Sequence, residues 1–234
     1  MWLIDLKTVP DPVTAKRLLA LESFSDSEAV LAMTVLRVAQ AQTAVQPTQC
    51  RRVVAATLLR VDDRGVEVVE FDDADGEPAL LAGVESELRR ADGPVWAWDA
   101  SQHYRSQMLT RALAYSLVMP RLLAERGPLS LASHFGFADG SAGLAELAAV
   151  HGLPHALGLR MADAEAAHGA GDRERLRAGS ACDALMAYLL TLTLQQATGE
   201  RSAADVADQR AVIRAWLSAQ LAPHWRAFLA RWKP

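Results

Sequence analysis

The chain has 234 residues, of which 51% are hydrophobic and 22% are charged, and its formal net charge is -4 with a pI of about 5.9. This length suits one large domain with or without an appendage, and the hydrophobic content excludes a disordered chain. The acidic balance excludes binding of nucleic acid through overall charge alone. Such binding requires a local basic patch. The candidates are Arg51-Arg52, Arg89-Arg90 and Arg105/Arg111, and the alternative is that these arginines belong to ordinary solvated faces.

Two cysteines, Cys50 and Cys182, are too few for a disulfide framework or a zinc motif, which favours a reducing, cytoplasmic location. The first residues lack the basic and apolar regions of a signal peptide. The longest apolar run, Ala184 to Leu194, is shorter than the ~20 residues that span a membrane. We therefore expect a cytoplasmic protein with no membrane partner.

The first predicted element is a buried strand at Trp2–Pro10, in which side chains alternate between two largely apolar faces. Asp5 is an exception among apolar neighbours, and we expect it at the C-terminal end of the strand. Open α/β sheets place their functional sites at such strand ends. The ordinary alternative is an aspartate that only caps the strand.

A helix is predicted over Val13–Leu21, and a capping box at Ser25 and Glu28 begins a second helix that runs to about Gln42. The chain then predicts two strands that form a hairpin, followed by a helix, a short buried strand and another helix. These elements are Val53–Val61 and Val66–Phe71 with a turn at Asp62–Gly65, then Pro78–Arg90, Val95–Trp98 and Gln102–Tyr115.

The second half of the chain is predicted to be helical. A short helix begins at Pro120, a loop follows at Gly136–Gly143, and a helix covers Leu144–His151. The helical signal is weak over Met161–Gly171. Arg173–Gln196 is predicted as two helices that meet near Gly179, and Ser202–Trp232 as a helical region with a break at Pro223. The whole order favours a mixed α/β sheet covered by helices.

Several short motifs occur in an order that resembles a known family. They are Leu3–Asp11, Arg52–Ala56, Trp98–Leu113, Leu144–Ala148 with Gly152-Leu153-Pro154, Cys182-Asp183 with Tyr188-Leu189, Thr198-Gly199 and Pro223–Trp232. Together they resemble the predicted PolB-like 3′–5′ exonucleases of the DEDD (DnaQ-like) group. The resemblance implies a ribonuclease H-like mixed sheet flanked by helices over residues 1–200, with a helical C-terminal extension, 201–234, packed on it.

The resemblance also implies two-metal phosphodiester hydrolysis with Mg²⁺ or Mn²⁺ held by converging carboxylates. Asp5 and Asp183 match the aspartates of the first and third motifs, and they are the candidate catalytic and metal-ligating residues. Three positions depart from the family pattern. Lys7 replaces a glutamate, Tyr104 an aspartate and Gly179 a tyrosine.

The charge of these positions decides the expected activity, because four carboxylates would neutralise two divalent ions. Lys7 is on the same strand face as Asp5, and we expect its ammonium to pair with Asp5 or Asp183 and fill the metal site. We therefore expect a degenerate exonuclease that needs no cofactor and serves as a nucleic-acid-binding or assembly module.

Two alternatives remain open. One is an active Mg²⁺- or Mn²⁺-dependent exonuclease with relocated ligands, for which Asp99 and the base His103 are the first substitutes and Asp139 and Asp163 are further ones. The other is a protein–protein interaction subunit that does not contact nucleic acid.

The partners expected are single-stranded nucleic acid, or a protein or second copy bound through the C-terminal helix. Trp225, Phe228, Leu229 and Trp232 follow one face of that helix. This face either packs on the sheet or docks the partner.

Overall fold

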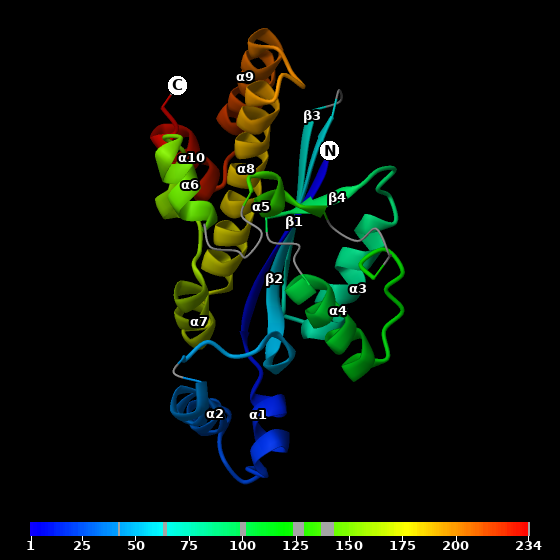
Figure 1. Ribbon diagram of the computed structural model, residues 1–234, viewed down its shortest axis with the longest axis vertical. Helices are drawn as coiled ribbons and strands as arrows, with labels where there is room; N and C mark the ends of the chain where they lie inside the picture. Colours follow the sequence, from blue (N-terminus) through cyan, green and yellow to red (C-terminus); the bar gives the residue numbers. More distant parts are fainter. Residues whose placement is uncertain (42, 63–64, 99–101, 124–128, 137–142, 234) are drawn as a thin grey trace.

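The computed structural model describes residues 1–41, 43–62, 65–98, 102–123, 129–136 and 143–233, and of residues 102–106 it describes only the backbone. In this part of the chain a five-stranded mixed sheet has helices on both faces (Figure 1). The strand order is β3-β2-β1-β4-β5, formed by Gly65–Asp72, Arg51–Asp62, Trp2–Pro10, Val95–Ala97 and Leu129–Ser130. The predicted fold class, a mixed α/β sheet with flanking helices, is confirmed and is consistent with a ribonuclease H-like fold.

The alternation of β1 sends its side chains into two separate cores. Leu3 belongs to the core that contains α8 (Arg173–Ala197), whereas Ile4 belongs to the core beneath α3 (Glu77–Leu88) and α4 (Gln102–Tyr115). Asp5 and Lys7 share the face of Leu3. The strand period therefore directs both ionisable side chains toward α8.

The position of Asp5 in β1 differs from the prediction. β1 pairs with β2 in antiparallel register along its whole length and continues to Pro10, so Asp5 lies in the middle of the strand. The parallel neighbour β4 is the strand that ends here, because it pairs only through Trp2 and Leu3 and stops at Ala97. Asp5 therefore lies beside the carboxyl end of β4.

The prediction of two helices meeting near Gly179 is wrong, because α8 is one continuous helix of 25 residues. A glycine inside a helix costs only about 1 kcal/mol, and the burial of α8 on nearly all sides offsets that cost. The buried part runs from Leu176 to Leu192. Even this apolar helix does not qualify as a membrane span, and neither does any other helix in the described residues.

The remaining helices on this side pack around α8 (Figure 1). They are α6 (Leu144–Val150), the 3₁₀ turn η2 (His155–Leu157), α7 (Met161–Gly169), α9 (Ala203–Ala219) and α10 (Pro223–Arg231). The predicted break at Pro223 is confirmed. Trp225, Phe228 and Trp232 are buried in the core with α8, so the aromatic face of α10 packs on helices rather than on the sheet.

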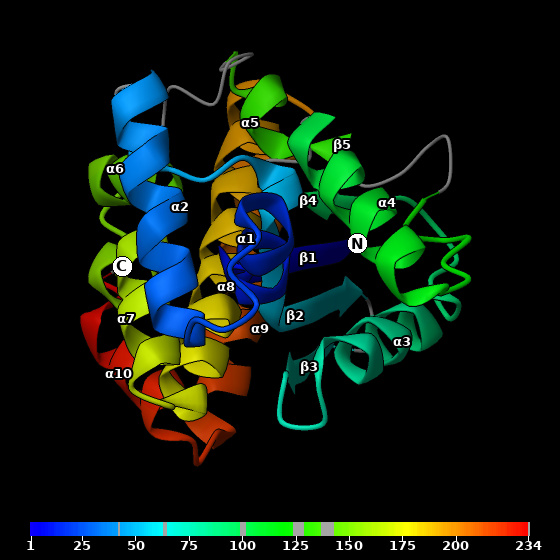
Figure 2. The same cartoon turned by 90° about the horizontal axis from the view of Figure 1, so that it is seen from below.

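A helical hairpin made of α1 (Pro12–Leu19) and α2 (Asp26–Ala41), here called the arm, continues from the end of β1 (Figures 1 and 2). The predicted capping box begins α2, since the Ser25 N–H donates to Glu28 Oε2 at 2.8 Å and the Glu28 N–H donates to Ser25 Oγ at 3.3 Å. After the arm, η1 (Thr48–Cys50) leads into β2.

Residues 120–123, the described part of the helix predicted to begin at Pro120, form a turn. The Arg121 and Leu122 N–H groups donate to the carboxylate of Glu85 at 3.0 and 3.1 Å. The prediction also missed β5 and α5 (Leu131–His134). The turn residues Asp63 and Arg64, and residues 137–142 of the predicted loop, lie outside the described part.

Candidate functional site

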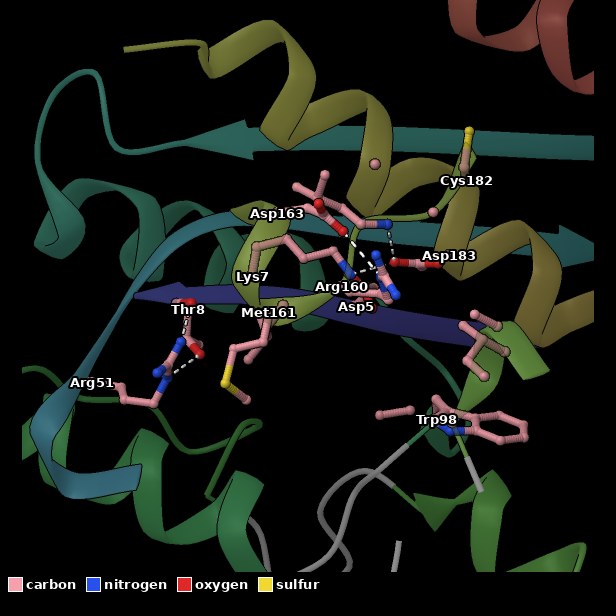
Figure 3. Close-up of a pocket in the computed structure, with 18 of the residues that line it drawn as sticks. Asp5, Lys7, Thr8, Arg51, Trp98, Arg160, Met161, Asp163, Cys182 and Asp183 are labelled. Atoms are coloured by element: carbon pink, nitrogen blue, oxygen red, sulfur yellow. Dashed lines mark hydrogen bonds and ion pairs between the residues drawn. The ribbon is translucent and has the colours of Figure 1, made fainter. Parts of the chain in front are cut away.

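Lys7, Asp5 and Asp183 form one buried ionic cluster where β1 meets α8 (Figure 3). The Lys7 Nζ atom lies 3.0 Å from Asp5 Oδ2 and 2.5 Å from Asp183 Oδ2. The side chains of Lys7 and Asp183 are each 9% exposed, and that of Asp5 is 16% exposed. The ammonium therefore joins the first-motif and third-motif aspartates, which are 178 positions apart in the sequence.

The same carboxylate oxygens accept further hydrogen bonds. The Ser180 hydroxyl donates to Asp5 Oδ2 at 2.7 Å, and the Leu159 N–H donates to Asp183 Oδ2 at 3.0 Å. Each Oδ2 atom thus receives one donor from Lys7 and one from another residue. These bonds stabilise the ionised carboxylates in a buried environment.

The electrostatics keep Lys7 charged. Burial by itself lowers the pKa of the Lys7 ammonium, but the attraction of Asp183 and Asp5 outweighs burial and the net pKa shift is upward. Burial raises the pKa of the Asp183 carboxyl, and Lys7 opposes that effect. One lysine faces two carboxylates, so the cluster retains about one negative charge when both are ionised.

Gly179, the position at which the resemblance implies a tyrosine, is covered by a segment from outside the helix. A Cβ atom placed on Gly179 would lie 2.5 Å from Leu159 Cβ, and one placed on Gly158 would meet Asp183 Oδ1 and Met186 Cε. The segment carrying Gly158 and Leu159 therefore lies directly on α8. A tyrosine at position 179 has no room unless this segment moves.

The described residues do not fit the two divalent ions that the resemblance implies. The ammonium of Lys7 lies within contact distance of both aspartates, at the place where a cation would have to bind. Among the described side chains, no group of three or more histidines, cysteines, aspartates or glutamates is arranged to hold a metal ion.

Not every predicted site residue is described. Asp99 and Asp139, and the side chains of His103 and Tyr104, lie outside the described residues, so their predicted roles stay predictions. The carboxylate of Asp163 is described, and it accepts from Arg160 Nε at 3.1 Å on the surface of α7.

A cleft of about 1660 Å³ opens over the cluster. Its walls come from β1, α2 and the segment between α2 and β2, α4, the region from α6 to α7, α8 and α10. Trp98, which follows β4, also lines it and is partly exposed (Figure 3). The ionic cluster therefore forms part of the wall of a large, accessible groove.

In two of the predicted basic patches, one of the two arginines is buried and paired with carboxylates. Arg51 is 4% exposed, donates to the Thr8 hydroxyl at 3.0 Å and pairs with Glu165 at 2.9 Å. Arg111 is 3% exposed and pairs with Asp11 and Glu77. Both arginines hold the body of the protein together.

Reasoning from the sequence missed Ser180, Gly158 and Leu159. Ser180 precedes Asp183 by three residues, so helical spacing offered a signal that the two share a face. Gly158 and Leu159 carry no such signal, because their contacts with the cluster depend on how the turn after η2 packs against α8.

The fold is a mixed α/β sheet flanked by helices, and the cluster places one ammonium between two aspartates. Residues 129–232 match the family of predicted 3′–5′ exonucleases related to the exonuclease domain of PolB, which confirms the resemblance over this part of the chain. The matched region contains Gly179 and Asp183 but not Asp5, Lys7 or Tyr104. No curated protein and no solved structure matches the chain.

Proposed function

We propose that this exonuclease-like domain has lost two-metal phosphodiester cleavage and serves as a module that binds single-stranded nucleic acid. The observation that carries the proposal is the position of Lys7 Nζ, 3.0 Å from Asp5 and 2.5 Å from Asp183. An ammonium and a divalent ion cannot occupy the same place, and displacing the ammonium would leave it buried without its counter-ions.

The retained cleft supports binding rather than a purely structural role. Of the five described lysines and arginines that line it, Lys7, Arg51 and Arg160 are in ion pairs, whereas Arg37 and Arg175 form none with a described acidic residue. Trp98 adds a partly exposed aromatic ring of the kind on which unpaired bases stack. The groove thus combines the two arginines outside those ion pairs, which can bind phosphates, with an aromatic ring, on which a base can stack.

The two cysteines are buried and not joined to each other. Burial raises the pKa of the Cys182 thiol, which makes it a poor nucleophile. Two such inert thiols suit a reducing compartment such as the cytoplasm.

A metal titration tests the loss of cleavage. With Mn²⁺ or Mg²⁺ in millimolar excess, we expect no rise in the melting temperature and no degradation of a 5′-labelled single strand. Saturable binding of two ions, together with degradation that Asp183→Ala abolishes, would overturn the proposal in favour of an active exonuclease that uses other ligands such as Asp99 and His103.

A reconstruction experiment makes the same test sharper. Lys7→Glu combined with Tyr104→Asp restores the family's carboxylates, and we expect at most partial cleavage because Leu159 still fills the place of the family's tyrosine. Lys16→Glu, which reverses a charge on the arm, is the matched control and should stay inactive.

Binding of a labelled single strand that weakens with salt separates this proposal from a protein-interaction subunit. Docking of a protein or a second copy through the C-terminal helix remains a separate proposal. It would have to use the outer face of α10, because Trp225, Phe228 and Trp232 are buried.

A further inference from the structure

We propose that Arg37 and Gln107 form a phosphate-binding subsite for a single strand on the arm side of the cleft. This inference rests on the function proposed above and names residues that the exonuclease resemblance does not assign. Two buried side-chain nitrogens without a hydrogen-bond partner, Nε of Arg37 and Nε2 of Gln107, carry it, and both residues line the same cleft.

Arg37 lies on α2 and lines the cleft. It is partly buried, and its Nε atom is buried without a hydrogen-bond partner. No described aspartate or glutamate forms an ion pair with it. A partly buried guanidinium without a counter-ion is costly, and an anionic ligand in the cleft would supply the missing partner.

Gln107 lies on α4, one turn before Arg111, and it also lines the cleft. Its side chain is among the buried polar groups, with 7% of the residue exposed, and its Nε2 atom has no hydrogen-bond partner. Buried amides in native proteins nearly always have partners, so an exception calls for an explanation. A ligand that accepts a hydrogen bond explains it.

The elements that carry the two residues both pack on η1. α4 contacts η1, and Cys50, the last residue of η1, packs with Ala29 and Met33 of α2. Thr48 and Gln49 of η1 line the cleft as well. Arg37 and Gln107 therefore approach the groove from two elements that meet around η1.

The chemistry favours a phosphodiester. A guanidinium and an amide both donate hydrogen bonds to anionic or polar oxygens, and each phosphate of a strand offers such oxygens. A cleft of about 1660 Å³ has room for several nucleotides, and Trp98 in the same cleft suits a base attached to that backbone.

The test measures the affinity of labelled oligothymidine and oligouridine by fluorescence anisotropy over a range of salt concentrations. Arg37→Gln should weaken binding roughly tenfold for both strands and make the slope of log K against log salt shallower by about 0.7, the value for one phosphate contact on a single strand. Arg17→Gln removes the same charge from an exposed position on the arm, and it should leave both quantities unchanged.

Gln107→Leu gives a second, independent readout. We expect roughly threefold weaker binding with no fall in the melting temperature, because leucine removes a buried donor that has no partner. A fall in melting temperature with unchanged affinity would show a structural role for the amide and overturn the subsite.

Three other outcomes also decide the matter. Equal losses for Arg37→Gln and Arg17→Gln would overturn the subsite while leaving nucleic-acid binding in place. Binding of a labelled polyglutamate peptide as tightly as a strand, with the same dependence on Arg37, would assign the residues to a carboxylate ligand. Absence of binding by the wild-type chain would overturn the proposed function itself.

Discussion

The protein contains two buried clusters in which one cation joins two carboxylates, and their surroundings differ. Arg111 donates to Asp11 Oδ2 at 2.8 Å, to Glu77 Oε1 at 2.9 Å and to the Tyr115 hydroxyl at 2.9 Å, and all three charged side chains are at most 4% exposed. Lys7 joins Asp5 and Asp183 beside a large cleft. Arg111, Asp11 and Glu77 are not among the residues that line that cleft.

The two clusters have similar ionic chemistry but different surroundings, and the surroundings decide the role of each cluster. The Arg111 cluster links α4 to the end of β1 and to the start of α3, and its role is structural. The Lys7 cluster has the same charge balance, but it occupies the place where the exonuclease resemblance requires metal ions. Its position, rather than its composition, makes it the candidate functional site.

Removal of Arg111 should have the largest effect on stability. Arg111→Met leaves Asp11 and Glu77 buried without a counter-ion, so we expect a loss of about 5 kcal/mol in the free energy of unfolding. Urea denaturation at pH 7 measures it. Arg90→Met, which breaks exposed pairs with Glu87 and Glu67, should cost less than about 1 kcal/mol.

Removal of Lys7 should cost less, about 3 kcal/mol, because Asp5 is partly exposed and the raised pKa of Asp183 allows its carboxyl to take up a proton. The cost of Lys7→Met should therefore shrink as the pH falls from 7 to 5. Denaturation at both pH values checks this. A cost that is the same at pH 5 and pH 7 would contradict the presence of unpaired carboxylates in the variant.

The packing of Leu159 on α8 is open to a smaller test. Gly179→Ala introduces a Cβ atom 2.5 Å from Leu159 Cβ, and we expect a loss of about 1–3 kcal/mol that Leu159→Ala partly restores in the double variant. Gly169→Ala is the matched control, since nothing lies within 4 Å of the added atom. Equal effects at the two glycines would contradict the close packing seen at Gly179.

The smallest expected effect is a difference between the two clusters in how the free energy of unfolding depends on alkaline pH. The native pKa of Lys7 is raised above that of free lysine, about 10.4, so its stabilising contribution is complete below that pH and falls as the pH rises further. By pH 11 the wild type should lose about 1 kcal/mol that Lys7→Met does not lose. Arginine remains protonated throughout this range, and Arg111→Met should therefore keep the wild-type slope in melting experiments from pH 9 to 11.

The local pattern was sufficient to predict most of the elements. The capping box at Ser25, the helix over Gln102–Tyr115 and the break at Pro223 are confirmed, because caps, helical spacing and proline act within a few residues. The two-helix prediction for α8 was wrong because burial overrides the weak helical preference of Gly179. The turn at Pro120 was missed because Glu85, 35 residues away, accepts its N–H groups.

Strand alternation in the sequence was enough to predict that Asp5 and Lys7 share one face of the first strand, since the side-chain period of a strand is 2. Its charge pattern also predicted that the ammonium would pair with a motif aspartate. Packing between distant elements was needed to show that Asp5 and Asp183 share that ammonium, that Leu159 packs against Gly179, and that Arg111 is buried. These contacts join residues up to 178 positions apart, and packing between separate elements sets them in a way that no local preference encodes.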